Sequence, residues 1–230
     1  MNRGTTNTIR KIIDEFIPPI IRDSRWFMYI FFWYWFKKKN LDLYMDFKKR
    51  AWGMTESEFT DCYRNLDCRA TDRPTDLNKK SISFMLEKLN TESTTLLDVG
   101  CGRGYWLSIL KQKTNLDLTG CDLFEKGDLE GIKYAKGDIE NLPFADNSFD
   151  IVTCCHTIEH IRDIKKAITE LKRVAKRQIV IVTPKQRYYY YTLDLHLHFF
   201  PVSEYLTQLV GLNNFECINC KGDWCYVADI

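Results

Sequence analysis

The chain has 230 residues, 45% of them hydrophobic, which is enough to fill the core of one domain with an additional segment. Its 33 basic and 31 acidic side chains leave a formal charge of +2, so no overall positive field favours nucleic acid as a partner. The nine cysteines follow no recognisable secretory leader, and we therefore expect reduced thiols in the cytoplasm instead of a disulfide framework.

An uncharged aromatic segment, WFMYIFFWYWF, occupies residues 26–36 and is followed by three lysines at 37–39. Crossing a bilayer takes about 20 apolar residues, so this segment is too short to span one. Its composition leaves no polar face, which predicts either a helix docked on the catalytic domain or one at the membrane interface, where aromatic rings and cations meet lipid. Peripheral membrane contact through residues 26–39 is therefore one expectation for a protein that is otherwise cytoplasmic.

Residues 1–90 are expected to form a helical cap. The prolines in IPP, residues 17–19, end any helix that begins earlier. Further on, DLNKKSISFMLEKLN offers Asp76 as an N-cap, followed by apolar residues on one helical face. This last helix is expected to lead into the core domain.

The segment TTLLDVGCGRGYWLSIL, residues 94–110, predicts a strand, a tight turn and a helix. Gly100, Gly102 and Gly104 permit backbone conformations that a side chain disfavours, and they let a ligand lie against the main chain. The helix that follows directs free amide groups to the same place. Tyr105 stands where a GxGxxG turn requires glycine, which argues against a pyrophosphate site.

The stretch LLDVGCGRG resembles motif I of the class I S-adenosylmethionine-dependent methyltransferases, in which an acidic residue precedes a GxGxG turn. The resemblance covers residues 94–185 and implies a doubly wound α/β domain over residues 91–230, with a mostly parallel, seven-stranded, Rossmann-like sheet. FECINC and WCYVADI would form its antiparallel edge pair, and the helix between strands two and three would be a stub.

The same resemblance implies S-adenosylmethionine as the cofactor and S-adenosylhomocysteine as its product. Asp122, in LDLTGCDLF, would end the second strand at the ribose hydroxyls, and Asp138, in KGDIENLPF, would lie near the adenine. The implied cofactor-binding residues are Asp98, Gly100, Cys101, Gly102, Gly104, Asp122, Leu123, Asp138, Ile139 and Cys155.

All four histidines lie in two short segments, CCHTIEH at 154–160 and DLHLHFF at 194–200. If a helix begins after the fourth strand, His156, Glu159 and His160 share one of its faces. If LHLH is extended, His196 and His198 point to the same side. Both segments follow the carboxyl ends of adjacent strands, where open parallel sheets bind their ligands.

Three interpretations of the histidines remain open. The first is a site for a divalent metal (Mn, Fe, Co or Zn), because Glu159 and His160 resemble part of the metal constellation of small-RNA 3′-terminal 2′-O-methyltransferases. The second is catalysis or substrate binding by the histidines without a metal. The third is packing alone. The candidate metal ligands are His156, Glu159, His160 and His198, and the candidate catalytic residues are His156, His160, His196 and His198.

The resemblance implies methyl transfer from S-adenosylmethionine, and we expect a substrate oxygen as the acceptor. The lead-in FIPPIIRD resembles the openings of bacterial methyltransferases linked to surface-polysaccharide assembly. We therefore expect a small-molecule substrate, a sugar or phosphate-bearing intermediate of capsule or lipopolysaccharide biosynthesis. A quinone-like lipid, RNA, and a non-catalytic binding protein of the same fold are the alternatives.

Overall fold

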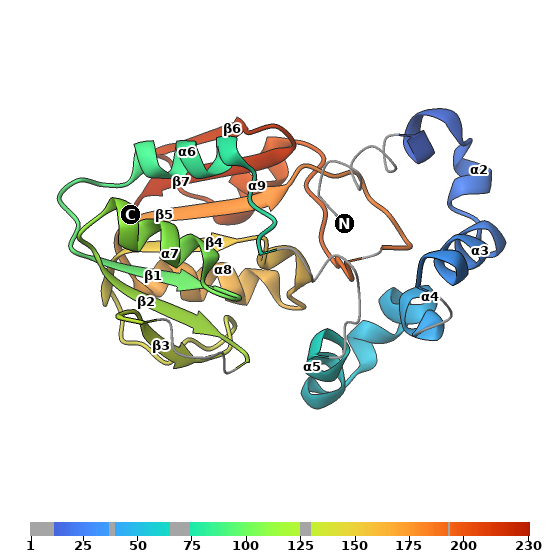
Figure 1. Cartoon of the computed structure of the whole chain (residues 1–230), viewed down its shortest axis with the longest axis horizontal. Coiled ribbons are helices and arrows are strands. Elements are labelled where there is room, and N and C mark those ends of the chain that lie inside the picture. The colour runs from blue at the N-terminus through green and yellow to red at the C-terminus, as the bar shows by residue number, and fades with distance from the viewer. Residues whose placement is uncertain (1–11, 37–39, 65–73, 125–129, 193) are drawn as a thin grey trace. The chain divides into compact units, whose positions relative to one another are not determined.

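The computed structural model describes residues 12–36, 40–64, 74–124, 130–192 and 194–230 (Figure 1). Their contacts divide the chain into two compact units. Residues 77–188 and 198–230 make up the first, which we call the sheet unit, and residues 1–76 and 189–197 the second, which we call the helical unit.

The sheet unit contains one seven-stranded sheet with the strand order β3-β2-β1-β4-β5-β7-β6 (Figure 1). Adjacent strands from β3 to β5 are parallel, whereas β7 runs antiparallel to both of its neighbours. This arrangement confirms the expected mostly parallel sheet with an antiparallel edge pair. The strands are β1 (Thr95–Val99), β2 (Asp117–Asp122), β3 (Lys133–Lys136), β4 (Phe149–Cys155), β5 (Ala175–Pro184), β6 (Phe215–Asn219) and β7 (Asp223–Asp229).

Helices cover both faces of the sheet, which explains why its central strands read as nearly continuous apolar runs. Helices α6 (Lys79–Lys88) and α7 (Tyr105–Lys113) pack on one face, and α8 (Ile164–Val174) and α9 (Ser203–Val210) on the other. In α8 the buried residues recur at helical spacing, and Asp163 caps the helix by accepting a hydrogen bond from the Lys166 amide.

Helix α6 lies where the sequence predicts it, but its N-cap is Asn78 and not Asp76. The Asn78 side chain accepts hydrogen bonds from the amides of Lys80 and Ser81, and its own amide group donates to Asp223 Oδ2 across 2.8 Å. Because α6 is bound to the sheet through these contacts, the boundary between the compact units precedes the helix. The expected division at residue 90 follows the helix instead.

The helical unit contains α2 (Pro19–Arg22), α3 (Arg25–Phe36), α4 (Leu41–Arg50), the 3-10 turn η1 (Ala51–Gly53) and α5 (Glu56–Arg64). Residues 12–16 are also helical and are separated from α2 by Ile17 and Pro18, as the proline pair predicts. Phe32, Tyr44 and Phe47 lie in the core of this unit. None of the described helices is both long and apolar enough to span a membrane.

A segment remote in sequence, residues 189–197, completes the helical unit. Leu195 is fully buried in its core, and the Leu195 carbonyl accepts a hydrogen bond from the Tyr63 hydroxyl across 2.9 Å. The Lys48 ammonium group donates to the Tyr189 carbonyl, and the Tyr191 ring packs edge-on against Phe32. The helical unit is therefore not built from the N-terminal residues alone.

Candidate active site

The predicted cofactor residues gather at one edge of the sheet unit. Strands β1, β2, β3 and β4 are parallel, so their carboxyl ends share an edge. The glycine turn follows β1, Asp122 ends β2, Asp138 follows β3 by two residues, and Cys155 ends β4. The sheet order changes direction beside β1, which is where open α/β sheets form a ligand crevice.

The glycine turn after β1 uses the left-handed backbone conformation three times. Gly100, Gly102 and Gly104 have φ values of +70°, +55° and +71°. A Cβ atom at Gly100 would also lie only 2.3 Å from Thr157 Oγ1, so this position excludes a side chain by contact as well as by conformation. The turn is held on β2 because the Gly100 amide donates a hydrogen bond to the Cys121 carbonyl across 2.8 Å.

Asp122 links the end of β2 to the glycine turn. Its Oδ2 accepts a hydrogen bond from the Gly102 amide across 2.8 Å, and its Oδ1 accepts one from the Phe124 amide across 3.2 Å. Each carboxylate oxygen has a further lone pair, which leaves acceptor capacity for a ligand. The carboxylate is thus held in place beside the turn, while Leu123, the next residue, is 37% exposed.

Asp98 is a buried carboxyl group within β1, one residue before the strand ends. Its Oδ1 accepts a hydrogen bond from the Thr153 hydroxyl on β4 across 2.7 Å. Burial raises the pKa of Asp98 to about 7, and the neighbouring charge of Asp122 adds to the increase, although the hydrogen bond from Thr153 opposes it. Asp98 can therefore exchange a proton near neutral pH.

The remaining predicted cofactor residues lie near the same edge. The Asp138 side chain accepts a hydrogen bond from the Glu140 amide, and Ile139 is buried in the core. Cys101 is buried in the turn. Cys155 contacts Met85 of α6 through sulfur, and burial raises its thiol pKa well above the ordinary value, so it is neutral. Their roles toward a cofactor stay predictions.

His156 lies between two buried carboxylates directly after β4. Its Nδ1 is 3.5 Å from Glu159 Oε1, and its Nε2 is 3.6 Å from Asp223 Oδ2. Burial on its own would lower the pKa of this imidazole, but the neighbouring carboxylates of Asp223 and Glu159 outweigh burial and raise the pKa to about 10. The ring is therefore an imidazolium at neutral pH.

Glu159 is fully buried, although it is a carboxylate. Among the described residues neither of its oxygens forms a hydrogen bond, and its ion-pair partner is His156 Nδ1 at 3.5 Å. A buried anion is costly unless a cation compensates it, and the imidazolium of His156 is such a cation. Ligand atoms of Glu159 and His160 lie within 4.8 Å of each other, which is compatible with a shared cation.

The other histidines are placed differently from the expectation. The segment after β4 forms a single 3-10 turn, η2 (Ile158–His160), instead of an α-helix. His198 Nε2 lies 2.7 Å from the Ile161 carbonyl and so donates a proton there. Residues 195–199 form no strand, and Leu195 has a φ of +55°, so strand alternation does not apply to His196 and His198.

His196 belongs to the helical unit, whereas the other three histidines belong to the sheet unit. A catalytic role for His196 therefore stays a prediction, and so does the metal site of His156, Glu159, His160 and His198. Within the sheet unit the structure brings together His156 and Glu159, and it places His160 beside Glu159.

Sequence reasoning missed three residues of this site: Asp223, Ser81 and Thr157. Asp223 is fully buried, and its Oδ2 accepts a hydrogen bond from the Ser81 hydroxyl across 2.8 Å. The expected antiparallel edge pair could have predicted Asp223, because an antiparallel strand begins at the edge of the sheet where its parallel neighbours end. Asp223, the first residue of β7, pairs with Pro184, the last residue of β5.

Comparison with known proteins identifies related sequences for the central part of the chain. Residues 97–182 match the family model described as a methyltransferase domain. The uncharacterized methyltransferase YcgJ of Bacillus subtilis (strain 168) is 32% identical over 93 residues, which are 36% of this chain and 36% of that protein. The demethylmenaquinone methyltransferase of Staphylococcus aureus (strain JH9) is 34% identical over 96 residues, or 37% of this chain and 40% of that protein.

The chain thus matches less than half of the length of these curated relatives. Among solved structures, a SAM-dependent methyltransferase from Aquifex aeolicus has a TM-score of 0.56 and 19% sequence identity. That alignment covers 77% of this chain and 99% of the other, and it shows a shared fold.

Proposed function

We propose that this chain, whose residues 97–182 match the methyltransferase-domain family model, is a class I S-adenosylmethionine-dependent methyltransferase that transfers a methyl group from S-adenosylmethionine to an oxygen atom of a small molecule. The observation that carries the proposal is the hydrogen bond between the Gly102 amide and Asp122 Oδ2. It holds a carboxylate beside a glycine turn whose three glycines are all left-handed.

The residues present fit the proposed donor. Asp122 would accept the two ribose hydroxyls, because a carboxylate forms charge-assisted hydrogen bonds with such donors. The glycine turn would allow the nucleoside to lie against the main chain, and Asp98 would face the cationic part of the donor. When bound, S-adenosylmethionine supplies an electrophilic methyl group, and the protein's task is to align the acceptor oxygen with it.

The acceptor would lie beside His156 and Glu159, at the carboxyl end of β4. A protonated His156 cannot act as a base, so we assign it the task of holding Glu159. Glu159, whose oxygens have spare acceptor capacity, would bind an acceptor hydroxyl and orient its lone pair toward the methyl group. A sugar or phosphate-bearing intermediate of capsule or lipopolysaccharide biosynthesis is the substrate class that we propose.

A quinone-like lipid is the second candidate substrate. Two observations favour it: helix α3 exposes a row of aromatic side chains, and one curated relative is a demethylmenaquinone methyltransferase. The two candidates differ in the solubility of the acceptor. Methyl transfer from labelled S-adenosylmethionine to detergent-dispersed quinones or to nucleotide sugars would separate them.

Calorimetric titration of the protein with S-adenosylhomocysteine tests the donor site. Asp122→Ala removes a charge-assisted acceptor, which is typically worth about 1.5–3 kcal/mol, and we expect binding to weaken about 10- to 100-fold. Asp117→Asn is the matched control, since Asp117 begins the same strand and forms an exposed ion pair with Lys133. Equal affinity of Asp122→Ala and the wild type would contradict the proposed site.

A divalent metal at the acceptor site is a separate question with its own measurement. Elemental analysis of purified protein, before and after His160→Ala, would detect a bound ion. Stoichiometric metal that disappears in the variant would support the metal interpretation of Glu159 and His160. Metal that persists in the variant would place the ion elsewhere.

A further inference from the structure

Helix α3 carries a continuous row of exposed aromatic and aliphatic side chains. Its members recur at i, i+3, i+4, i+7 and i+8, so they share one side of the helix. Between 43% and 79% of the surface of each is exposed. This outer face consists of Trp26, Tyr29, Ile30, Trp33 and Tyr34.

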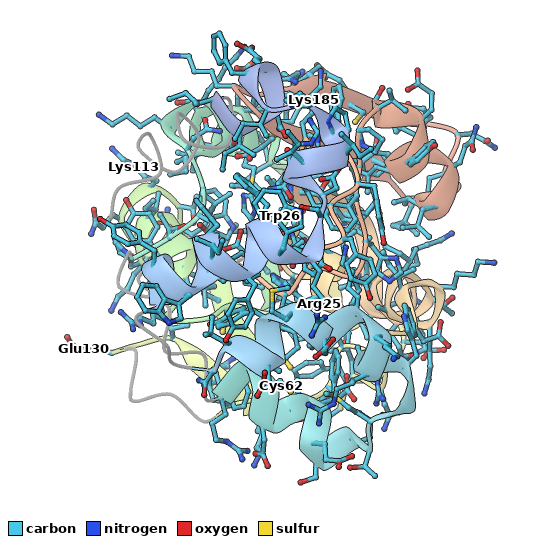
Figure 2. The ribbon with its side chains drawn as sticks, turned by 90° about the vertical axis from the view of Figure 1, so that its right-hand side faces the viewer. Arg25, Trp26, Cys62, Lys113, Glu130 and Lys185 are labelled. Atoms are coloured by element: carbon cyan, nitrogen blue, oxygen red, sulfur yellow. The ribbon has the colours of Figure 1, made fainter. Side chains whose placement is uncertain are left out.

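The opposite side of α3 is the side that packs within the helical unit. Met28 and Phe32 are buried there, and the Phe32 ring packs edge-on against Tyr44 of α4. The Arg25 guanidinium donates to both carboxylate oxygens of Asp46 on α4, at 2.7 and 3.2 Å. Figure 2 labels Arg25 and Trp26, the first two residues of α3. These contacts fix the rotation of α3 about its axis, so the outer face is the side not used for packing on α4.

The exposed apolar character extends to the residues before α3. Phe16 is 76% exposed and Ile20 is 85% exposed. Single exposed apolar residues are common on protein surfaces, but a contiguous set of large ones marks an interaction site. The residue types narrow the choice of partner, since tryptophan and tyrosine are enriched where a protein meets both hydrocarbon and water.

We infer that the outer face of α3 docks the protein on the surface of an anionic lipid bilayer. The helix has 12 residues and is therefore about 18 Å long, against a hydrocarbon thickness of about 30 Å, so it would lie in the interface plane without crossing. In the sequence, the lysines at 37–39 directly follow the helix and supply the positive charge that anionic lipid attracts. Lysine is depleted in interfaces between proteins, which favours lipid over a second copy of the chain.

This inference does not depend on methyl transfer, and the experiment that tests it measures only the binding of the protein to vesicles. The full-length protein is sedimented with sucrose-loaded vesicles of phosphatidylcholine, either pure or mixed with phosphatidylglycerol. We expect binding to the mixed vesicles that weakens with added salt. The variant Trp26→Ser/Trp33→Ser/Tyr34→Ser should lose at least tenfold in its apparent partition coefficient.

The matched control is Trp52→Ser/Tyr205→Ser, which removes two aromatic side chains of similar exposure that lie outside α3. We expect this control to bind vesicles as the wild type does. If the triple variant does not fold, Trp26→Phe/Trp33→Phe retains the apolar surface and removes two fluorophores. It should lower the quenching of tryptophan fluorescence by brominated lipid without lowering sedimentation.

Two outcomes would overturn the inference. The first is a wild-type protein that stays in the supernatant with mixed vesicles at low salt. The second is a dimer, seen by analytical ultracentrifugation, that the triple variant dissociates while vesicle binding is absent, because the outer face would then hold a second copy of the chain.

Discussion

His156 Nε2 lies 3.6 Å from Asp223 Oδ2, so the end of β4 and the start of β7 meet through a buried charge pair. Asp223 is in turn bound to Asn78 and Ser81 at the start of α6. Three elements from distant parts of the sequence are therefore joined at one carboxylate. This carboxylate and Glu159 keep His156 protonated in the apolar interior of the sheet unit.

Replacing Asp223 with Asn should destabilise the protein strongly. Removing one partner of a buried ion pair leaves the other charge uncompensated, which typically costs about 3–5 kcal/mol in the free energy of unfolding. Urea denaturation followed by circular dichroism measures the loss. The control is Asp146→Asn, because Asp146 pairs with Arg173 at the surface and such pairs contribute about 0–1 kcal/mol. Equal losses in the two variants would contradict a charged His156.

The same pair predicts a dependence of stability on pH. The pKa of His156 is raised above its ordinary value of 6.5 to about 10 in the folded protein. The stability that its protonation contributes is therefore fully present below pH 6.5 and is lost as the pH rises through about 10. An NMR titration should show His156 still protonated at pH 8, and Asp223→Asn should bring its titration midpoint down. A midpoint near 6.5 in the wild type would refute the assignment.

At the glycine turn, the addition of a single methyl group should reduce the free energy of unfolding strongly. Gly100→Ala combines a left-handed backbone with a Cβ only 2.3 Å from Thr157 Oγ1. Gly211→Ala is the matched control, since Gly211 has a similar φ of +66° and its Cβ would meet only the Gln208 carbonyl oxygen at 3.7 Å. The control should lose about 1–2 kcal/mol in the free energy of unfolding from backbone strain, and Gly100→Ala clearly more.

A second substitution separates strain from contact at this turn. Thr157→Gly removes the atoms that the new Cβ would meet, so it should recover part of the loss in Gly100→Ala and none in Gly211→Ala. Thermal unfolding of the single and double variants forms the required cycle. Additive effects at Gly100 and Thr157 would show that the close approach is not the cause.

Local patterns in the sequence were sufficient to predict the sheet and the glycine turn. Apolar runs such as TTLLDV are typical of strands that are buried on both faces. Alternating glycines indicate a turn whose backbone adopts left-handed conformations. The positions of Asp98, Gly102 and Asp122 at one edge follow from parallel strand order alone. The family resemblance implied a doubly wound, mostly parallel sheet of seven strands, and the structure supplies the order β3-β2-β1-β4-β5-β7-β6.

Local sequence patterns could not predict contacts between residues that lie far apart in the sequence. The sequence indicated an extended segment around DLHLHFF, residues 194–200, but it gave no sign that the Tyr189 and Leu195 carbonyls accept hydrogen bonds from Lys48 and Tyr63 of the helical unit. Likewise Asn78 competes successfully with Asp76 as the N-cap because its amide also binds Asp223. Such choices depend on partners more than a hundred residues away, and no local propensity encodes them.

Buried and exposed residues of α3 should lose very different amounts of stability when they are replaced with alanine. Phe32→Ala removes a fully buried ring that packs against Tyr44 and Tyr191, and we expect a loss of about 3–5 kcal/mol in the free energy of unfolding. Tyr34→Ala removes a ring that is 79% exposed, and its cost should stay below about 1 kcal/mol. Denaturation curves of the two variants check the rotation of α3, and reversed costs would contradict the outer face.

Asp98 should couple donor binding to the release of a proton. Burial raises its pKa from the ordinary value of 3.8 to about 7. The neutral carboxyl therefore stabilises the fold below about pH 4, and this contribution is lost as the pH rises through about 7. Asp98→Asn keeps the shape without the charge. We therefore expect it to raise the free energy of unfolding at pH 8 by about 4 kcal/mol relative to the wild type.

Burial favours the neutral form of Asp98, but a bound cationic ligand would favour the ionised form because opposite charges attract. Binding of S-adenosylmethionine at pH 6.5 should thus release a proton from the wild type, and affinity should rise with pH up to about 8. Calorimetry in two buffers with different ionisation enthalpies counts the protons released. Asp98→Asn should bind more weakly and release none, while Asp117→Asn behaves as the wild type. Proton release that persists in Asp98→Asn would assign the titration to another group and leave Asp98 as a packing residue of β1.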